Sequence, residues 1–355
     1  MTYSSKLSVG HCPGIQYNGD TWVQEEGNAT MEYTTLGRSG LKVSRLCLGT
    51  MNFGVDTDEK EAFRIMDAAL DAGINFFDTA NIYGWGENAG RTEKIIGRWF
   101  KLGGGRRART VLATKFYGDM QDKTDGPNGE RGLSAYKLRR HLEGSLKRLK
   151  TDHIELYQMH HVDRNVSWAE LWNAFEHAAA SGQIGYVGSS NFAGWDMAVA
   201  QGEAKARGLL GLVSEQHKYN LLCRLPELEV LPAAEHLGIG IIPWSPLDGG
   251  LLAGNWHRGG AGKRSGDAKR LDKHREQLEA FSALCDELGA REDTVALAWL
   301  LANPAVTAPI IGVRTLEQFQ RSLKAVELKL DEQALARLDE IFPGPGGDAP
   351  RAYAW

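Results

Sequence analysis

Short apolar runs alternate with longer segments of helical periodicity along most of the chain, and this alternation constrains the fold more than any other feature. In the first unit, an apolar run at 45–49 precedes a segment at 58–72 in which apolar residues recur every three or four positions, as on one face of a helix. Eight such units follow one another. Parallel strands buried on both faces are mostly apolar, and eight βα units close a barrel. The sequence therefore predicts an α/β fold, a (β/α)8 TIM barrel formed by a single domain.

The other units follow the same pattern, with two additions. The seventh helix is delayed by a long Gly-rich, basic loop at 247–270, and an extra helix at 331–341 follows the eighth unit. A short hairpin at 34–43 precedes the first strand and is predicted to plug one end of the barrel. The remaining strands are expected at 74–78, 110–115, 154–160, 184–189, 213–216, 239–244 and 309–312.

The main rival fold is a doubly wound open sheet, which usually has fewer strands. When such a sheet binds a dinucleotide, its first βα turn carries the pattern GxGxxG. Here that turn, at 49–54, reads Gly-Thr-Met-Asn-Phe-Gly and does not match. Gly84, Gly86 and Gly90 are out of register and follow the second strand instead of the first. The barrel remains the prediction.

The two ends of the chain differ in composition from the region between them. Residues 1–31 are polar and Gly-rich without sustained periodicity, and we expect a flexible N-terminal arm. The barrel domain is predicted at 32–342. Residues 343–355 form a Pro- and Gly-rich C-terminal tail.

Overall charge and composition narrow the classes of partner. The formal net charge is -4 and the isoelectric point is near 6.2, so no electrostatic reason favours nucleic acid or an anionic membrane. No apolar run approaches the roughly 20 residues of a membrane helix, and the N-terminus lacks a signal-peptide pattern. The four cysteines are far apart, without the spacing of a zinc site, and no metal site is predicted. We expect a reduced, cytoplasmic protein.

Ionisable residues stand at or just beyond the ends of three successive predicted strands. The second strand ends in Asp78 with Tyr83 on the loop beyond, the third ends in Lys115, and the fourth ends in His160. Each has an ordinary structural explanation when taken alone, such as a turn cap, a rim aromatic, a solvated lysine or a core histidine. In a barrel, however, the carboxyl ends of the strands meet at one face. The four residues are therefore predicted to form one polar cluster.

Such a cluster suits proton donation. A free phenol has a pKa of about 10, and a neighbouring ammonium group lowers it, while a buried carboxylate keeps the ammonium charged. We expect Asp78 to hold Lys115, Lys115 to lower the pKa of Tyr83, and His160 to orient a substrate oxygen. This chemistry protonates a carbonyl oxygen as it becomes an alkoxide, and it requires a hydride source.

These residues, in the contexts Asp-Thr-Ala-Asn-Ile-Tyr at 78–83, Ala-Thr-Lys at 113–115 and Leu-Tyr-Gln-Met-His at 156–160, resemble the catalytic tetrad of the aldo-keto reductase family. The resemblance covers about 32–341. It implies a barrel that binds NADPH without a Rossmann unit, and reduction of an aldehyde or ketone with Tyr83 as the general acid. Because the histidine is retained, carbonyl reduction is favoured within the family.

The resemblance also implies a cofactor site. Ser190, Asn191 and Gln216 match residues that hold the nicotinamide carboxamide, and Trp244 matches the aromatic on which the nicotinamide ring stacks. The sequence departs from the family pattern at Ser322, where many relatives carry Asn, and this weakens the expected adenine contact. Residues matching the pyrophosphate segment are Ser245, Leu247, Gly249, Gly250 and Leu251, and those matching the adenosine segment are Gly312, Arg314, Gln318 and Ser322.

The substrate is less constrained than the reaction. The sequence is similar to bacterial members that include reductases of nucleotide-linked deoxysugars, and general aldehyde reduction fits nearly as well. Two other functions remain open: a Schiff-base aldolase acting through Lys115, and a cofactor-binding regulatory or sensor subunit with weak activity. The oligomeric state is not predicted. Candidate substrate-pocket residues are Met51, Phe53, Trp85, Phe116, Tyr117 and His161.

Overall fold

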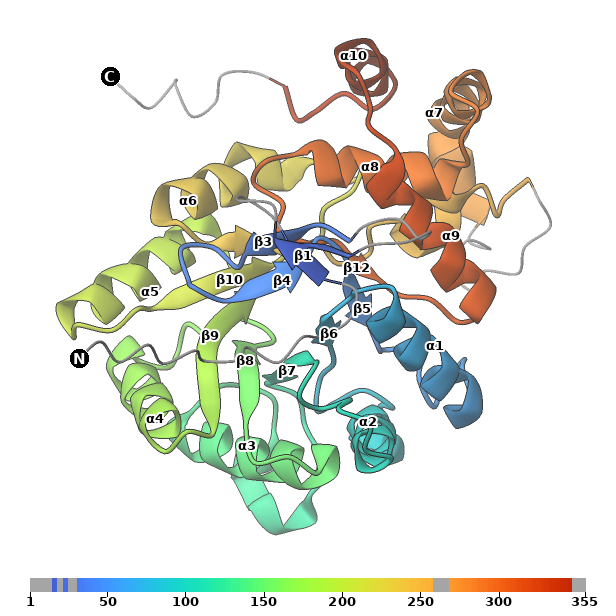
Figure 1. The fold of residues 1–355 in the computed structure, drawn as a ribbon. Coiled ribbons are helices and arrows are strands. Elements are labelled where there is room, and N and C mark those ends of the chain that lie inside the picture. The colour runs from blue at the N-terminus through green and yellow to red at the C-terminus, as the bar shows by residue number, and fades with distance from the viewer. Residues whose placement is uncertain (1–14, 18–21, 25–30, 258–267, 347–355) are drawn as a thin grey trace, which may run out of the picture.

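Eight parallel strands form the centre of the molecule, and helices surround them (Figure 1). The computed structural model describes residues 15–17, 22–24, 31–257 and 268–346. The strands pair in the order β11-β10-β9-β8-β7-β6-β5-β12. Their bounds are β5 Cys47–Gly49, β6 Phe76–Asp78, β7 Val111–Phe116, β8 Ile154–Met159, β9 Ile184–Ser190, β10 Leu212–Gln216, β11 Gly240–Ile241 and β12 Ile310–Ile311.

Backbone hydrogen bonds connect the first and last strands of that order and close the barrel. The Thr307 amide donates to the Ile241 carbonyl at 2.8 Å, and the Ile310 amide donates to the Pro243 carbonyl at 2.9 Å. Arg45, just before β5, holds the segment that precedes β12. Its guanidinium group donates hydrogen bonds to the carbonyls of Leu301, Val306 and Thr307. The predicted (β/α)8 barrel is confirmed.

The helices bury the faces that their periodicity predicts. In α1, the Asp58 side chain accepts a hydrogen bond from the Glu61 amide at 2.9 Å and caps the first turn. The apolar residues expected on one face of this helix are buried, from Ala62 to Leu70. The α-helices are α1 Glu59–Asp71, α2 Arg91–Lys101, α3 Ala135–Leu149, α4 Trp168–Ala180, α5 Gly194–Ala206, α6 Val230–Leu237, α7 Ala268–Glu287, α8 Glu292–Ala302, α9 Leu316–Glu327 and α10 Glu332–Ile341.

The loops contain further short structure. The long loop after β11 includes a 3-10 helix, and the helix that follows begins earlier than the sequence predicts, at Ala268. The 3-10 helices are η1 Gly86–Asn88, η2 Lys123–Gly129, η3 Leu225–Leu228 and η4 Asp248–Ala253.

An antiparallel hairpin, β3 Tyr33–Thr35 with β4 Lys42–Ser44, closes the amino-terminal end of the barrel. Leu36 and Val43 are fully buried, and they pack with residues near the starts of the strands. The predicted plug is therefore confirmed, and it leaves the carboxyl ends of the strands at the opposite end. The barrel interior at this level consists of Leu36, Val43, Cys47, Phe76, Ala113, Leu156, Val213, Ile242, Ala308 and Ile310.

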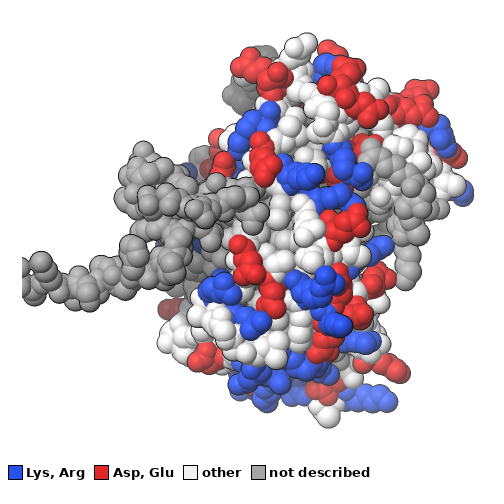
Figure 2. Space-filling model, turned by 45° about the vertical axis from the view of Figure 1, so that its right-hand side comes forward, with Lys and Arg blue, Asp and Glu red and all other residues white. Residues whose placement is uncertain are grey.

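Of the N-terminal arm, the structure describes two short paired strands, β1 Ile15–Tyr17 and β2 Trp22–Gln24. The flexibility of the arm stays a prediction, and most of the C-terminal tail lies outside the described residues. Within 31–257 and 268–346, no helix is long and apolar enough to cross a bilayer. On the face shown in Figure 2, acidic and basic side chains are interspersed.

Leu36→Ala should destabilise the fold through loss of the plug. The side chain is fully buried, and deletion of such a side chain costs about 2–5 kcal/mol, because a cavity remains. Equilibrium denaturation at fixed pH measures this change. Leu225→Ala is the control, since Leu225 is 69% exposed and should change stability by less than about 0.5 kcal/mol. Equal stability of the two variants would contradict the plug.

Candidate active site

Three of the four predicted catalytic residues form one buried hydrogen-bonded group. Lys115 Nζ lies 2.6 Å from Asp78 Oδ2 and 3.2 Å from Tyr83 Oη, and it donates to the Thr79 carbonyl at 2.8 Å. Lys115 is fully buried, and Asp78 and Tyr83 are nearly so. The group forms because β6 ends at Asp78 beside β7, which carries Lys115 on its inner face.

The other oxygen of Asp78 is held by two glutamines. Gln216 Nε2 donates to Asp78 Oδ1 at 2.8 Å, and Gln158 Nε2 donates to the same oxygen at 3.1 Å. Sequence reasoning missed Gln158. Strand alternation could have identified it, because Leu156 faces the barrel interior and residue 158, two positions later, faces the same way.

The charge on Lys115 is secured by this arrangement. Burial on its own would lower the pKa of the lysine, but Asp78 and Tyr83 outweigh burial and raise it above its ordinary value. The amine therefore remains an ammonium group at neutral pH, held against a carboxylate and a phenol.

The pKa of Tyr83 shifts in the direction opposite to the sequence expectation. Burial raises the pKa of the phenol, and the lowering effect of Lys115 does not overcome it. The expectation of a lowered pKa is wrong because it considered the ammonium charge without the loss of water around the ring. The phenol therefore stays protonated, as a proton donor must before it acts.

His160 lies beside the phenol and is also uncharged. Its ring centroid is 6.1 Å from that of Tyr83, in an edge-on arrangement, and it stacks on His161 at 5.2 Å. Burial, with a contribution from Lys115, lowers the pKa of His160 well below its ordinary value. A neutral imidazole has one donor and one acceptor nitrogen. Within the described residues neither ring nitrogen makes a hydrogen bond, and the Tyr83 hydroxyl has no acceptor.

The loop that carries Tyr83 is fixed to the barrel and to α3. The Asn81 amide donates to the Lys115 carbonyl at 3.2 Å. The Asn81 side chain lies 2.9 Å from Nδ1 of His141, which is buried on α3. Burial lowers the pKa of His141 to about 3, so the imidazole is neutral and can accept this hydrogen bond.

The residues predicted to hold the carboxamide lie next to His160. Asn191 Nδ2 donates to the His160 carbonyl at 3.1 Å and to Ser190 Oγ at 3.0 Å, and its Oδ1 accepts from Trp244 Nε1 at 3.1 Å. Ser190 Oγ donates to the Gln216 carbonyl at 2.8 Å. Asn191 has φ of 61°, a conformation that Asn adopts more readily than most residues. The structure therefore brings Ser190, Asn191, Gln216 and Trp244 together.

The segment predicted to cover the pyrophosphate is a tight turn. Ser245, Gly249 and Gly250 all have positive φ. Leu247 is half-buried and Leu251 packs into the core, so Leu251 offers its backbone rather than its side chain.

The negative charge of one residue in this turn is balanced by two basic side chains. Asp248 forms ion pairs with Lys218, at 3.1 Å, and with Arg270.

The predicted adenosine segment begins α9. Arg314 Nε lies 3.7 Å from Asp56 Oδ2, on the loop after β5. Gln318 Oε1 accepts from the Arg314 amide at 2.9 Å, and Ser322 Oγ donates to the Gln318 carbonyl at 3.0 Å. Ser322 is buried against its own helix, which leaves Arg314 as the main polar group here. Gly312 contributes its carbonyl to a hydrogen bond from Asn52.

The candidate substrate residues divide into partly exposed residues near Tyr83 and His161 and fully buried residues in the core. Trp85 is 42% exposed, and its ring lies 5.8 Å from that of Tyr83. Tyr117 packs against His161 at 5.1 Å, and Met51 is half-buried. Phe53 and Phe116 are fully buried in the core between barrel and helices, and Phe116 stacks on Tyr157. Neither side chain exposes surface to a substrate, and Phe116 lies on the strand face opposite to that of Lys115. Both observations argue against contact of these two residues with substrate.

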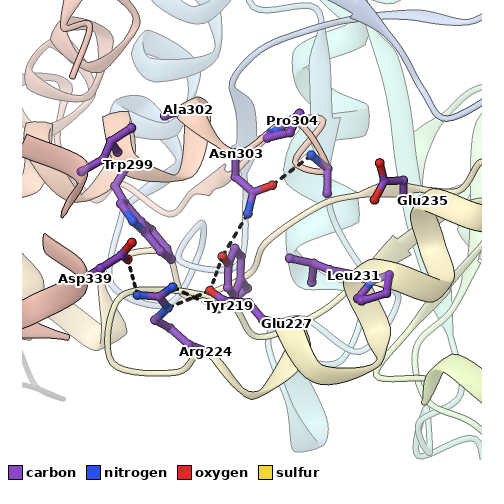
Figure 3. A pocket seen from close by; sticks show the side chains of 13 residues that line it. Tyr219, Arg224, Glu227, Leu231, Glu235, Trp299, Ala302, Asn303, Pro304 and Asp339 are labelled. Atoms are coloured by element: carbon purple, nitrogen blue, oxygen red, sulfur yellow. Dashed lines mark hydrogen bonds and ion pairs between the residues drawn. The ribbon is translucent and has the colours of Figure 1, made fainter. Parts of the chain in front are cut away.

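A surface hollow of about 440 Å³ lies elsewhere, among residues from α6, α8, α10 and the loop after β10 (Figure 3). Arg224 crosses it, binding Glu227 and Asp339 and lying 5.3 Å from the ring of Trp299. The hollow shares no residue with the catalytic group. Tyr219, Arg224, Glu227, Asn303 and Asp339 bind one another there, and we assign the hollow a structural role.

Comparison with known proteins agrees with the fold. The model of the aldo/keto reductase family matches residues 45–342. The chain belongs to this family, and family membership supports a general function as an oxidoreductase acting on carbonyl groups.

Individual relatives carry several names. The chain is 66% identical over 328 residues to the uncharacterized oxidoreductase YrpG of Bacillus subtilis, covering 92% of this chain and 100% of the relative. It is 29% identical to the versiconal hemiacetal acetate reductase of Aspergillus parasiticus, covering 88% and 97% of the two chains. It is 33% identical to a probable voltage-gated potassium channel subunit beta of Arabidopsis thaliana, covering 84% and 92%.

The buried His141 should make the fold sensitive to acid. The unfolded imidazole binds a proton near pH 6.5, whereas the folded one does so only near pH 3. The free energy of unfolding should therefore fall as pH decreases from 6.5 towards 3. His141→Gln, which keeps an acceptor for Asn81, should show a shallower slope in denaturation at several pH values. An unchanged slope would contradict the assignment.

Proposed function

We propose that this protein reduces an aldehyde or ketone to an alcohol, using hydride from NADPH and a proton from Tyr83. The observation that carries the proposal is the buried contact of Lys115 Nζ with both Asp78 Oδ2, at 2.6 Å, and Tyr83 Oη, at 3.2 Å. A buried ammonium ion beside a protonated phenol favours the phenolate that remains after proton transfer. The group is thus suited to release a proton when negative charge develops on a substrate oxygen.

The open polar atoms support a position for that oxygen. The hydroxyl of Tyr83 and the ring nitrogens of His160 lack partners within the described residues. A carbonyl oxygen placed between them would accept hydrogen bonds from the phenol and the neutral imidazole. Tyr83 then transfers its proton to the oxygen, and Lys115 stabilises the phenolate until solvent restores the proton.

The residues present fit a nicotinamide cofactor, which when bound supplies the hydride. Gln216 Oε1 has no hydrogen bond within the described residues, and it lies on the amide that also contacts Asp78. It can accept from a carboxamide N–H. Ser190 and Asn191 adjoin it, and Trp244 offers a ring surface at the same strand ends. Arg314 can provide a guanidinium group for the 2′-phosphate.

The same geometry disfavours a Schiff-base aldolase. Formation of a Schiff base needs an uncharged amine that can attack a carbonyl carbon. Lys115 is instead held as an ammonium ion by Asp78, and its pKa is raised. Reduction therefore remains the proposal, and a sugar or nucleotide-linked deoxysugar carbonyl is the substrate class to assay first. We place the activity in the cytoplasm.

Tyr83→Phe should abolish most turnover while leaving cofactor binding unchanged. Loss of a general acid typically lowers rate about 10²- to 10⁴-fold, and the ring itself is retained. NADPH oxidation with a reactive aldehyde such as nitrobenzaldehyde measures turnover, and fluorescence titration measures the Kd for NADPH. Full turnover in the variant would remove Tyr83 from this role.

Arg314→Ala should weaken NADPH binding far more than NADH binding. A hydrogen bond to a charged group contributes about 1.5–3 kcal/mol, so the NADPH affinity should fall about tenfold or more. Titration with each cofactor measures both Kd values.

Asp56→Asn is the matched control for this prediction. It removes the carboxylate 3.7 Å from the same guanidinium and should strengthen NADPH binding. Equal losses of both cofactors in Arg314→Ala would refute the phosphate contact.

A further inference from the structure

Two glutamine amides meet at one oxygen of Asp78, and this fixes which way each amide points. A carboxylate only accepts hydrogen bonds, so the nitrogen of each amide must face Asp78 Oδ1. Gln216 Nε2 also donates to Gln158 Oε1, at 3.4 Å. Both N–H groups of Gln216 thus have acceptors in the barrel, and its oxygen points away from them.

Gln158 is built into the barrel as firmly as the catalytic residues. It is fully buried on β8, in register with Lys115 on one side and Gly188 on the other. A Cβ at position 188 would come within 3.1 Å of Gln158 Cγ and 2.5 Å of Ser214 Oγ. Glycine at this position therefore leaves the room that the Gln158 side chain occupies.

We propose that Gln158 is a positioning residue that holds the Gln216 amide with its oxygen outward, so that the site selects the NH2 group of the nicotinamide carboxamide. This inference rests on the proposed function, because it assumes that a nicotinamide cofactor binds beside Gln216. Asp78 by itself fixes one N–H of Gln216 and leaves the amide free to swing about that bond. Gln158 engages the second N–H and removes this freedom.

The same contact connects the carboxamide to the proton donor. Hydrogen bonds run from Gln216 to Asp78 Oδ1, and from Asp78 Oδ2 through Lys115 to Tyr83. A misplaced Gln216 amide would loosen the support of Asp78 as well as the carboxamide contact. The ordinary alternative is that Gln158 merely satisfies a buried polar network, which would affect stability without affecting recognition of the cofactor.

A cofactor analogue separates these two explanations. In reduced 3-acetylpyridine adenine dinucleotide phosphate, a methyl group replaces the carboxamide NH2. The wild-type protein should bind NADPH about tenfold more tightly than this analogue, since one hydrogen bond is lost and a buried acceptor is left unpaired. Fluorescence titration gives both Kd values. Equal binding of the two by the wild-type protein overturns the inference without any variant.

The variants then assign the effect. Gln216→Met should reduce the ratio of the two Kd values to about one, and Gln158→Met should reduce it to about threefold, because the acceptor is kept but poorly held. Both substitutions nearly preserve side-chain length. Gln158→Leu removes the amide with a side chain of different shape, which separates loss of the amide from an effect of packing. The double variant Gln158→Met/Gln216→Met should show the same ratio as Gln216→Met, because Gln158 acts through Gln216. A full tenfold ratio in folded Gln158→Met or Gln158→Leu would overturn the inference.

Gln201→Met is the matched control. Gln201 is a partly buried glutamine outside the site, whose amide binds the Leu212 backbone. Its loss should lower the melting temperature while leaving the ratio unchanged. A protein that binds neither NADPH nor the analogue would refute the proposed function itself. Tight binding of both with the wrong pattern of ratios would refute only the role of Gln158.

Discussion

A buried ion pair between Asp78 and Lys115 is the interaction on which the rest of the site depends. Removing two charges from water is costly, and the attraction between them repays that cost only when their other hydrogen-bonding groups are also satisfied. Here the lysine also binds the Thr79 carbonyl and the Tyr83 phenol, and the second carboxylate oxygen binds Gln158 and Gln216. The contacts that stabilise the pair also connect Tyr83, the proposed proton donor, to the candidate cofactor site.

The barrel brings these residues together because its two ends differ. The hairpin β3–β4 fills the amino-terminal end with apolar side chains such as Leu36 and Val43, so no polar group is needed there. At the other end the five consecutive strands from β6 to β10 each contribute a polar residue at or next to the last position, and neighbouring strands place these residues close together. Neutral His160 and protonated Tyr83 follow from this burial, since both charged forms are disfavoured away from water.

The sequence predicted the barrel, the plug and the grouping of Asp78, Tyr83 and Lys115, because strand periodicity determines which residues reach the strand ends. It could not predict quantities that depend on three-dimensional surroundings. The pKa of Tyr83 depends on a balance of burial and charge that spacing does not contain. Phe116 looked like a pocket residue beside Lys115, yet strand alternation turns it outward against Tyr157. Gln158 was missed although strand alternation from Leu156 turns it towards the interior. The Arg314–Asp56 pair could not be predicted, because it joins residues far apart in sequence.

The most direct measurement is the single-turnover rate of hydride transfer from NADPH to an aldehyde in Asp78→Asn, in Lys115→Met and in the double variant. If the buried pair and the phenol act as a unit, each single substitution removes most of the rate and the double variant is no slower than the slower single variant. Independent effects that multiply in the double variant, or a wild-type rate in Lys115→Met, would contradict a proton donor held by this ion pair.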